Sequence, residues 1–393
     1  MVKYLEEFHP PERLLMGAGP SNVNPRVLRA MIEPLLGHLD PDFVGVMDDV
    51  KAMLGLVFQT QNTITVPISG TGSAGMEASL VNTLEPGDTI VVAINGYFGT
   101  RLADIAERCN AQVVRVMFEW GSPIDPNVLE TELKTLGRVK AVAFVHAETS
   151  TGVVNPAQDI ATIANNHGAL VIMDAVTSLG GIEVPVDKWG IDVCYSGSQK
   201  CLGCPPGLSP ITMSPRAEEI LASRKTPVQS WYLDLSLLRS YWGNNRVYHH
   251  TAPISMIYAL REGLRVVLEE GLEERFQRHQ RSAQVLHAGL TALGLDLFAQ
   301  EDHRLPCLTS VNIPIGIEDA VVRRTLLTEH NIEIGGGLGP VAGKVWRIGL
   351  MGENAYIPKV LTLLSALEHV LQKQGYEVAV GQSLAAAQEV LAS

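Results

Sequence analysis

The run Asp192-Val-Cys-Tyr-Ser-Gly-Ser-Gln-Lys200 decides how this chain is interpreted. It begins as a short apolar strand and continues as a tight Ser/Gly turn that carries a lysine just beyond the strand end. A second apolar strand, Leu170-Val-Ile-Met173, stops at Asp174. Because ligands of parallel sheets bind beyond the carboxyl ends of the strands, we expect Asp174 and Lys200 to meet in one site.

An aspartate and a lysine at such strand ends meet the needs of pyridoxal phosphate chemistry. The lysine forms a Schiff base with the cofactor, and the carboxylate pairs with the pyridinium nitrogen so that the ring can accept electrons. A single lysine in a polar turn is more often simply solvated, so the prediction depends on further parts of the site.

Short β-rich runs alternate with helical patterns from about residue 60 to 215, which is typical of a mostly parallel sheet covered by helices. The segments Ser69–Ser73 and Thr149–Gly152 follow strand ends, as Asp174 and Lys200 do. The expected strands are 63–68, 89–94, 112–116, 139–145, the stretch around Val171, and 193–196.

The second part of the chain predicts a smaller α+β unit reached through a long connector helix from about Ile254 to Arg275. The Ala-rich tail from Gly375 is expected to form a loosely attached helix. We therefore expect an N-terminal arm over 1–20, a large domain over 21–272 and a small domain over 273–393. Within the small domain we expect a helix at 281–293 and strands at 309–313 and 344–349.

Composition excludes several classes of protein. The 393 residues carry a net charge of −12 and contain no basic run with interleaved aromatic residues, which argues against nucleic acid and anionic membranes as partners. Met1–Arg13 lacks the apolar core of a signal peptide, and no stretch approaches the length of a membrane span. Five scattered cysteines indicate a reducing compartment, so the cytoplasm is the expected location.

The glycine-rich segment Ser69-Gly-Thr-Gly-Ser73 lies between a predicted strand and a predicted helix. Glycines let the backbone approach an anion, and helix-start amides with the hydroxyl of Thr71 or Ser73 can hold a phosphate. The segment matches neither the Walker loop nor the dinucleotide fingerprint. The alternative is a βα turn that binds nothing.

Three further side chains complete the candidate constellation, each with a plainer alternative. Phe98 follows a strand and could stack on the pyridine ring, although such aromatics more often pack in a core. Thr149 could donate to the cofactor or merely cap a helix. Arg347 lies inside an apolar strand and suits a substrate carboxylate, whereas a buried salt bridge with a glutamate is the alternative.

Two clusters resemble metal or redox sites but fit other roles better. Tyr248-His-His-Thr251 lacks a third metal ligand at suitable spacing, so we expect Thr251 to cap the following helix and Tyr248 to contact phosphate. Cys201-Leu-Gly-Cys204 has no second pair, and we interpret both cysteines as small residues that fill space beside the cofactor.

Taken together, these segments resemble the class V pyridoxal-phosphate aminotransferases, specifically the alanine–glyoxylate / serine–pyruvate aminotransferase family. The resemblance runs in collinear order from about residue 14 to 352. The matching segments are Gly17-Ala-Gly-Pro-Ser-Asn22, Ser69-Gly-Thr-Gly72, Glu85-Pro-Gly-Asp88, Ser150-Thr-Gly-Val153, Ser178-Leu-Gly-Gly181, Tyr195-Ser-Gly-Ser-Gln-Lys200, Pro205-Pro-Gly207, Tyr248-His-His-Thr251, Gly336-Gly-Leu-Gly339 and Arg347-Ile-Gly-Leu350.

The resemblance implies fold type I: a large domain with a mostly parallel seven-stranded sheet, a smaller C-terminal α+β domain, and a homodimer with active sites at the subunit interface. It implies that Lys200 and Asp174 are catalytic and that Arg347 binds the substrate carboxylate in a pocket that includes Gly19 and Ser21. The implied cofactor-binding residues are Thr71, Gly72, Ser73, Phe98, Thr149, Asp174, Gln199 and Lys200, with Tyr248 and Thr251 reaching the partner subunit's cofactor.

Three of these positions depart from the animal enzymes of the family. Phe98 stands in place of a tryptophan, Ser73 in place of a histidine and Thr149 in place of a serine. The latter two keep a hydrogen-bonding group, while Phe98 keeps a stacking face and loses the indole donor. These three differences bear on how tightly the cofactor binds and not on which cofactor is expected.

The expected activity is transfer of an amino group from alanine or serine to glyoxylate by a ping-pong mechanism. An (S)-ureidoglycine–glyoxylate aminotransferase would share the same lysine, aspartate and arginine, so it remains the alternative. A cysteine desulfurase would need a cysteine in the loop Gly335–Gly339, which has none. A non-catalytic subunit that retains the fold is the alternative from another class.

Overall fold

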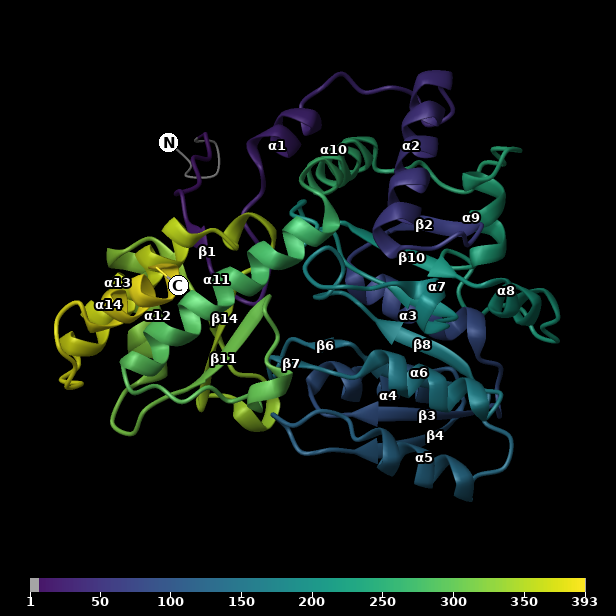
Figure 1. The fold of residues 1–393 in the computed structure, drawn as a ribbon. Coiled ribbons are helices and arrows are strands. Elements are labelled where there is room, and N and C mark those ends of the chain that lie inside the picture. The colour runs from purple at the N-terminus through teal and green to yellow at the C-terminus, as the bar shows by residue number, and fades with distance from the viewer. Residues whose placement is uncertain (1–6, 393) are drawn as a thin grey trace.

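The computed structural model describes residues 7–392, and its ribbon divides into a larger and a smaller half (Figure 1). The chain contains two main apolar cores. The buried side chains of the larger core come from residues 27–267, and those of the smaller one from Met16 and residues 283–387. A third, small cluster of apolar side chains includes Cys201 and Cys307. The division into segments 1–20, 21–272 and 273–393 stays a prediction, and the first six residues of the expected arm lie outside the described part.

A seven-stranded sheet forms the centre of the larger half, and every neighbouring pair is parallel except those made by one strand, β10. The strands β3, β5 and β8 are almost continuously apolar and buried, as expected of a sheet covered on both faces, whereas the edge strand β4 is mostly exposed or half-buried. Their order is β2 (Ile64–Ser69), β10 (Leu208–Met213), β9 (Val193–Tyr195), β8 (Leu170–Asp174), β5 (Ala141–Val145), β3 (Thr89–Ile94) and β4 (Gln112–Met117).

This sheet confirms the predicted fold class and six of the strands, and adds one that the pattern did not reveal. β10 runs antiparallel to both β2 and β9, after the turn Pro205-Pro-Gly207 has reversed the chain. Its sequence, Leu-Ser-Pro-Ile-Thr-Met, contains a proline and two hydroxyl residues, which are unusual for a central strand.

The helices that connect these strands pack on the sheet. α3 (Gly72–Thr83) contacts β9 and β10, and α4 (Tyr97–Arg108) contacts β3, β4 and β5. The other elements of this half are α1 (Pro25–Met31), α2 (Pro41–Phe58), α5 (Pro126–Thr135), β6 (Ala147–Glu148), β7 (Val153–Val154), α6 (Ala157–Asn166), α7 (Val186–Trp189), α8 (Pro215–Ala222) and α9 (Leu235–Trp242).

The expected helices over 254–275 and 281–293 are confirmed as helical segments, but the expected break between them is in the wrong place. The chain instead forms α10 (Ile254–Glu270) and a long α11 (Leu272–Ala292), divided at Gly271. Gly271 has a φ of +89°, a conformation that glycine adopts without strain, so the axis changes direction there. Figure 1 shows α11 reaching from α10 into the smaller half.

The smaller half is built on a three-stranded antiparallel sheet in the order β11 (Leu308–Asn312), β14 (Val345–Gly349) and β13 (Gly335–Gly336). Both strands predicted here are confirmed to within a residue. The remaining elements are η2 (Glu301–His303), α12 (Asp319–Glu329), β12 (Ile332–Glu333), η3 (Gly339–Val341), η4 (Gly352–Asn354) and α13 (Ile357–Lys373).

Both ends of the described chain are fastened to the smaller core. β1 (Leu14–Leu15) pairs in parallel with β12, and Met16 is fully buried. The tail forms the predicted helix, α14 (Gln382–Ala392), but it is not loosely attached: it packs on α11 and α13. Ser383 donates from its amide and hydroxyl to Glu368, and Ala387 is fully buried, because the alanines allow close helix packing.

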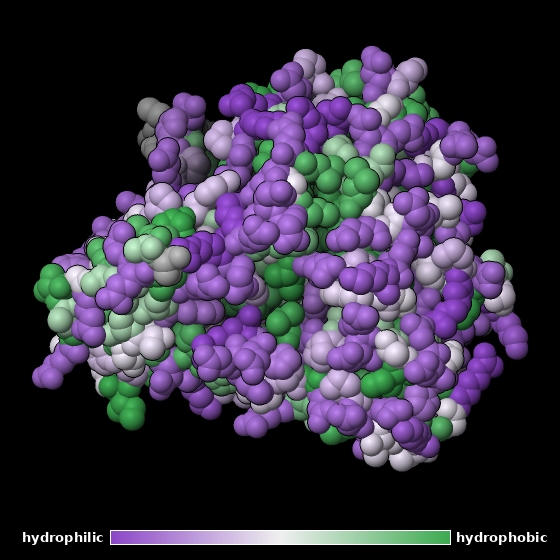
Figure 2. Space-filling view, in the orientation of Figure 1, coloured by the Kyte–Doolittle hydropathy of each residue, from purple (hydrophilic) through white to green (hydrophobic). Residues whose placement is uncertain are grey.

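The described helices include none that is both long enough and apolar enough to cross a membrane. On the face shown in Figure 2 hydrophilic side chains predominate, and hydrophobic ones gather over α10 and along the seam between the two halves.

Candidate active site

A cavity of about 180 Å³ opens beyond the carboxyl ends of the parallel strands. It brings together eight of the residues predicted from sequence: Thr71, Gly72, Ser73, Phe98, Thr149, Asp174, Gln199 and Lys200. The cavity is also lined by Met76, Arg101, Val145 and Val176, which sequence reasoning did not select. The expectation that these strand ends share one site is confirmed.

Lys200 presents its amine at a buried position and is only 9 % exposed. Nζ donates to the carbonyl oxygen of Ala18. Burial, aided by the positive charge of Arg347, lowers the pKa of Lys200 to about 8, against the opposing effects of Cys201 and Asp174. About a tenth of the amine is therefore uncharged at pH 7, and only the uncharged amine is a nucleophile.

Gly19 and Ser21 lie directly against this lysine. A Cβ on Gly19 would fall 2.6 Å from Nζ, and the residue has a φ of +100°, so both space and backbone conformation require glycine. The Ser21 hydroxyl donates to the Lys200 carbonyl oxygen at 3.1 Å, and its amide donates to that of Gln199 at 3.0 Å. The segment after β1 therefore holds the lysine turn in place.

Asp174 ends β8 and is 3 % exposed. Its Oδ1 accepts from the Val176 amide and its Oδ2 from the Tyr195 hydroxyl, both at 2.8 Å. Burial raises the pKa of Asp174 to about 6 despite these two donors. The sequence analysis did not select Tyr195 although it belongs to the quoted run, because its place opposite Asp174 depends on the β8–β9 register, which only the structure shows.

The start of α3 provides an electropositive wall of the cavity. The first amides of a helix have no partner within the helix, and the Thr71 side chain at the N-cap does not bond to them. The Arg101 guanidinium adds a positive charge to this wall, where its Nη1 donates to the Ser73 hydroxyl at 3.3 Å. These features suit an anionic group such as a phosphate.

Phe98 is positioned by a buried carboxylate and a cation. Glu148 accepts from the amides of Phe98 at 3.2 Å and Gly99 at 3.3 Å, and from the Ser150 hydroxyl at 2.6 Å. Burial raises the pKa of Glu148 in spite of these donors. The Arg101 guanidinium lies 5.0 Å from the Phe98 ring centroid, so the ring packs under a cation. The spacing of Phe98 and Arg101 on one helix was the signal that could have revealed the arginine.

Arg347 lies on β14 and is 8 % exposed. Its Nε donates to the Gly336 carbonyl oxygen at 2.7 Å and its Nη1 to that of Thr149 at 3.4 Å. It forms no ion pair with any carboxylate among residues 7–392. The alternative of a buried salt bridge is therefore wrong, and part of the guanidinium remains available to an anion.

Five predicted residues are not among those that line this cavity: Gly19, Ser21 and Arg347, which contact Lys200 or Thr149, and Tyr248 and Thr251. Tyr248 is 58 % exposed, and Thr251 is exposed as well. Thr251 does not cap α10, whose N-cap is Pro253, because the intervening proline delays the start of the helix. Neighbouring His250 pairs through Nε2 with the Ser69 hydroxyl at 2.7 Å.

The residues around Lys200 fit pyridoxal phosphate. The buried Oε1 of Gln199 has no hydrogen-bond partner, which is unusual for a buried polar atom and indicates a donor supplied by a ligand. A carboxylate, a lysine of lowered pKa and an electropositive helix start face one cavity. These three groups match the pyridine nitrogen, the aldehyde and the phosphate of the cofactor, respectively.

Comparisons with known proteins agree with this chemistry. The family model described as aminotransferase class-V matches residues 13–350. The chain is 43 % identical to the (S)-ureidoglycine–glyoxylate transaminase of Bacillus subtilis, over 98 % of this chain and 96 % of that one. It is 42 % identical to the alanine–glyoxylate aminotransferase of Callithrix jacchus, over 92 % and 88 % respectively.

Two solved structures are similar over nearly their whole length. The ureidoglycine–glyoxylate aminotransferase of Bacillus subtilis superposes with a TM-score of 0.97 at 44 % identity, covering 99 % of this chain and 100 % of that one. The alanine–glyoxylate aminotransferase of Nostoc sp. gives a TM-score of 0.92 at 50 % identity, with coverage of 93 % and 97 %.

Proposed function

This chain belongs to the class V aminotransferases, pyridoxal phosphate enzymes of fold type I, and from that premise we propose that it transfers the amino group of L-alanine or L-serine to glyoxylate. The products are glycine and a 2-oxo acid. The observation that carries the proposal is the single cavity in which Asp174 and Lys200 meet. A relative at 50 % identity is named for alanine and glyoxylate.

We assign the cofactor to the residues of this cavity. Lys200 would bind it covalently, Asp174 would pair with the ring nitrogen, and Phe98 would stack on the ring. The remaining polar residues, Thr71, Gly72, Ser73, Thr149 and Gln199, would hold its phosphate and ring oxygen. When bound, the cofactor supplies an electron sink for the reaction.

The chain's own residues carry out the rest of the mechanism. Arg347 binds the substrate α-carboxylate with its free N–H groups, and Gly19 and Ser21 shape the pocket for the side chain. The uncharged Lys200 amine takes the proton from the substrate Cα and acts as the general base. Asp174 in its charged form keeps the ring nitrogen protonated. Donor and acceptor use the same cavity in turn, so the kinetics are ping-pong.

A homodimer is part of the proposal. Tyr248 and Thr251 lie outside their own chain's cavity, and we assign them to the phosphate of the partner subunit's cofactor. The segment before α2 exposes the large apolar side chains of Ile32, Leu35 and Leu39, and His38 packs 5.2 Å from the Tyr248 ring. Apolar side chains gathered beside a functional residue are typical of an interface. Light scattering of the purified protein measures the assembly.

The second candidate is an (S)-ureidoglycine–glyoxylate aminotransferase. It is favoured by the extent of the match to the Bacillus subtilis enzyme. That match covers 98 % of this chain, whereas the match to the Callithrix jacchus enzyme covers 92 % of it. Both candidates use the same lysine, aspartate and arginine and differ in recognition of the donor side chain. A non-catalytic subunit is disfavoured, because both catalytic residues are present in the cavity.

Spectroscopic titration of the purified protein tests the proposal. Donors are added in turn, namely L-alanine, L-serine and (S)-ureidoglycine, and the visible absorbance of the bound cofactor is followed. Loss of the absorbance with alanine or serine, and its return with glyoxylate, is expected. A response to ureidoglycine alone would select the second candidate, and a colourless protein that binds no pyridoxal phosphate would refute both. The K200A variant is the control. Location in the cytoplasm stays a prediction.

A further inference from the structure

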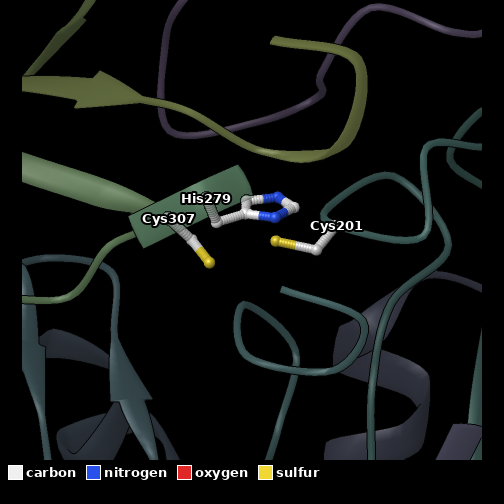
Figure 3. Close-up of side chains that lie close together, drawn as sticks. All are labelled: Cys201, His279 and Cys307. Carbon is white, nitrogen blue, oxygen red and sulfur yellow. The ribbon is translucent and has the colours of Figure 1, made fainter. Parts of the chain in front are cut away.

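Three reactive side chains lie together beside the active site without lining its cavity. Cys201, His279 and Cys307 are all 0 % exposed, and their sulfur and nitrogen atoms lie within 4.8 Å of one another (Figure 3). Cys201 directly follows Lys200, Cys307 directly precedes β11, and His279 lies on α11. The cluster therefore joins the lysine turn to the smaller half.

The hydrogen bonds of His279 argue against a metal ion here. Its Nδ1 pairs with the Arg275 carbonyl oxygen at 2.7 Å, and its Nε2 accepts from the Gly352 amide at 3.1 Å. Both ring nitrogens are thus already occupied by backbone groups. The guanidinium of Arg275, itself only 1 % exposed, donates to the Cys201 carbonyl oxygen at 2.6 Å and places a positive charge at the cluster.

The two sulfur atoms face one another, as Figure 3 shows. A Cβ placed on Gly181 would lie 2.4 Å from the Cys307 sulfur and 2.5 Å from that of Cys201, so the missing side chain leaves room for both. Cys204 points elsewhere, since its sulfur contacts the Ala259 carbonyl oxygen at 3.5 Å. Cys307, and not the sequence neighbour Cys204, is the partner that the fold brings to Cys201.

Cys201 also has the electrostatic surroundings of a reactive thiol. Burial alone would raise its pKa, but hydrogen bonding with Cys307 and the charges around it outweigh burial, and the pKa of Cys201 falls well below its ordinary value. Burial and the same hydrogen bond raise the pKa of Cys307. Cys201, whose Sγ donates to the Thr177 carbonyl oxygen at 3.2 Å, is therefore the more acidic thiol of the pair, and Cys307 is the one that keeps its proton.

We propose that Cys201 and Cys307 form a reversible disulfide when the protein meets a peroxide. The Cys201 thiolate attacks one oxygen of hydrogen peroxide, the O–O bond breaks, and hydroxide leaves with a sulfenic acid on Cys201. The Cys307 sulfur then attacks the Cys201 sulfur, and the hydroxyl group leaves as water with the Cys307 proton. The hydroxide takes up the proton that Cys201 released on ionisation, so two thiols are oxidised and the peroxide is reduced to two molecules of water.

Access to the pair follows from its place in the fold. Cys201 and Cys307 belong to the small third cluster and not to either main core. Small peripheral clusters open at a lower free energy than large cores. Separation of the two halves along this seam would expose the sulfur atoms to a molecule as small as hydrogen peroxide.

The disulfide would tie the catalytic lysine to the substrate-binding strand. Cys307 accepts through its carbonyl oxygen from the Leu350 amide at 2.8 Å, and Ser310 lies opposite Arg347 in the β11–β14 register. Oxidation would therefore fix the Lys200 turn relative to the strand that carries Arg347. An enzyme that must adjust this distance during turnover would lose activity reversibly.

Peptide mapping of the full-length, cofactor-loaded protein tests the proposal. The protein is treated with hydrogen peroxide, blocked with iodoacetamide under denaturing conditions, and digested without reduction. We expect a cross-linked peptide pair that contains Cys201 and Cys307, disappears with dithiothreitol, and accounts for the loss of two of the five thiols. Activity should fall in proportion to the cross-linked fraction and return on reduction.

Matched variants sharpen the result. C307S should give no cross-link and keep its activity under peroxide, whereas C204S should cross-link as the unmodified protein does. Slower hydrogen exchange of residues 195–204 after oxidation gives a readout independent of activity. A Cys201–Cys204 disulfide, or oxidation of Cys201 to a sulfinic acid without any cross-link, would overturn the proposal. So would one zinc or copper ion per chain in the protein as purified, bound through these thiols.

Discussion

The hydrogen bond from Tyr195 to Asp174 offers a sharp test of how the site holds a charge. In the Y195F variant the Asp174 carboxylate loses one of its two donors and remains buried, because Asp174 is 3 % exposed and Tyr195 is 0 % exposed. A hydrogen bond to a charged group contributes about 1.5–3 kcal/mol. Since 1.4 kcal/mol is a factor of ten, cofactor affinity should fall about 10- to 100-fold.

The affinity of Y195F for the cofactor should also depend on pH, and the pKa of Asp174 gives the direction of that dependence. Burial already raises the pKa of Asp174 to about 6, and removal of a donor to the charged form raises it further. The carboxylate must be charged to pair with the ring nitrogen, so Y195F should bind most weakly below pH 7 and recover as the pH rises. The dissociation constant of pyridoxal phosphate, measured by fluorescence quenching of the cofactor-free protein from pH 6 to 9, tests this.

Y376F is the matched control, because the Tyr376 hydroxyl makes an exposed hydrogen bond to Gly294 in the smaller half. Its dissociation constant should equal that of the unmodified protein. If Y195F also binds with unchanged affinity at every pH, Asp174 is not held in its charged form by Tyr195, and the electrostatic account of the site is refuted.

Three further substitutions or titrations address other parts of the site. R347K should raise the KM for the amino donor about 10- to 100-fold with a smaller change in kcat, since lysine cannot form the two parallel hydrogen bonds; steady-state kinetics measure it. The rate at which trinitrobenzenesulfonate labels Lys200 in the cofactor-free protein should rise with pH around a midpoint near 8, and a midpoint above 10 would contradict the lowered pKa. E148Q should lower the free energy of unfolding by about 1–3 kcal/mol, because two amides at the start of α4 lose a charged acceptor, while exposed E130Q should change it little; urea denaturation compares them.

Sequence patterns predicted the sheet well because its strands are short, apolar and bounded by clear turns. The strand 89–94 agrees with β3 residue for residue. β10 was missed since Pro210 and its hydroxyl neighbours obscure an apolar run, and the pairing partners that tolerate them are distant in sequence. The break at Gly271 was missed because a lone glycine in a helical pattern is often tolerated.

The site, like the fold, has parts that the sequence predicted and parts that it did not. Lys200 and Asp174 were predictable, because a strand end fixes where a residue lies along the sheet. The supporting contacts were not: Tyr195 reaches Asp174 across neighbouring strands, and Glu148 reaches the amides of α4 from the short strand β6. Such contacts depend on side-chain directions that spacing does not encode. The role of Tyr248 stays a prediction for a different reason, since the cofactor that it would contact belongs to a second chain.

The short segment between Met16 and Ser21 has a mechanical consequence. One end is anchored in the smaller core through Met16, and the other is bonded to the backbone of the lysine turn through Ser21. Between them, the Ala18 carbonyl oxygen accepts from the Lys200 amine itself. A shift of the smaller half relative to the larger one would therefore displace the carbonyl group that orients the amine. The position of the smaller half and the reactivity of the Lys200 amine would then change together. Lengthening the segment by a few residues would separate the two effects without altering the cavity.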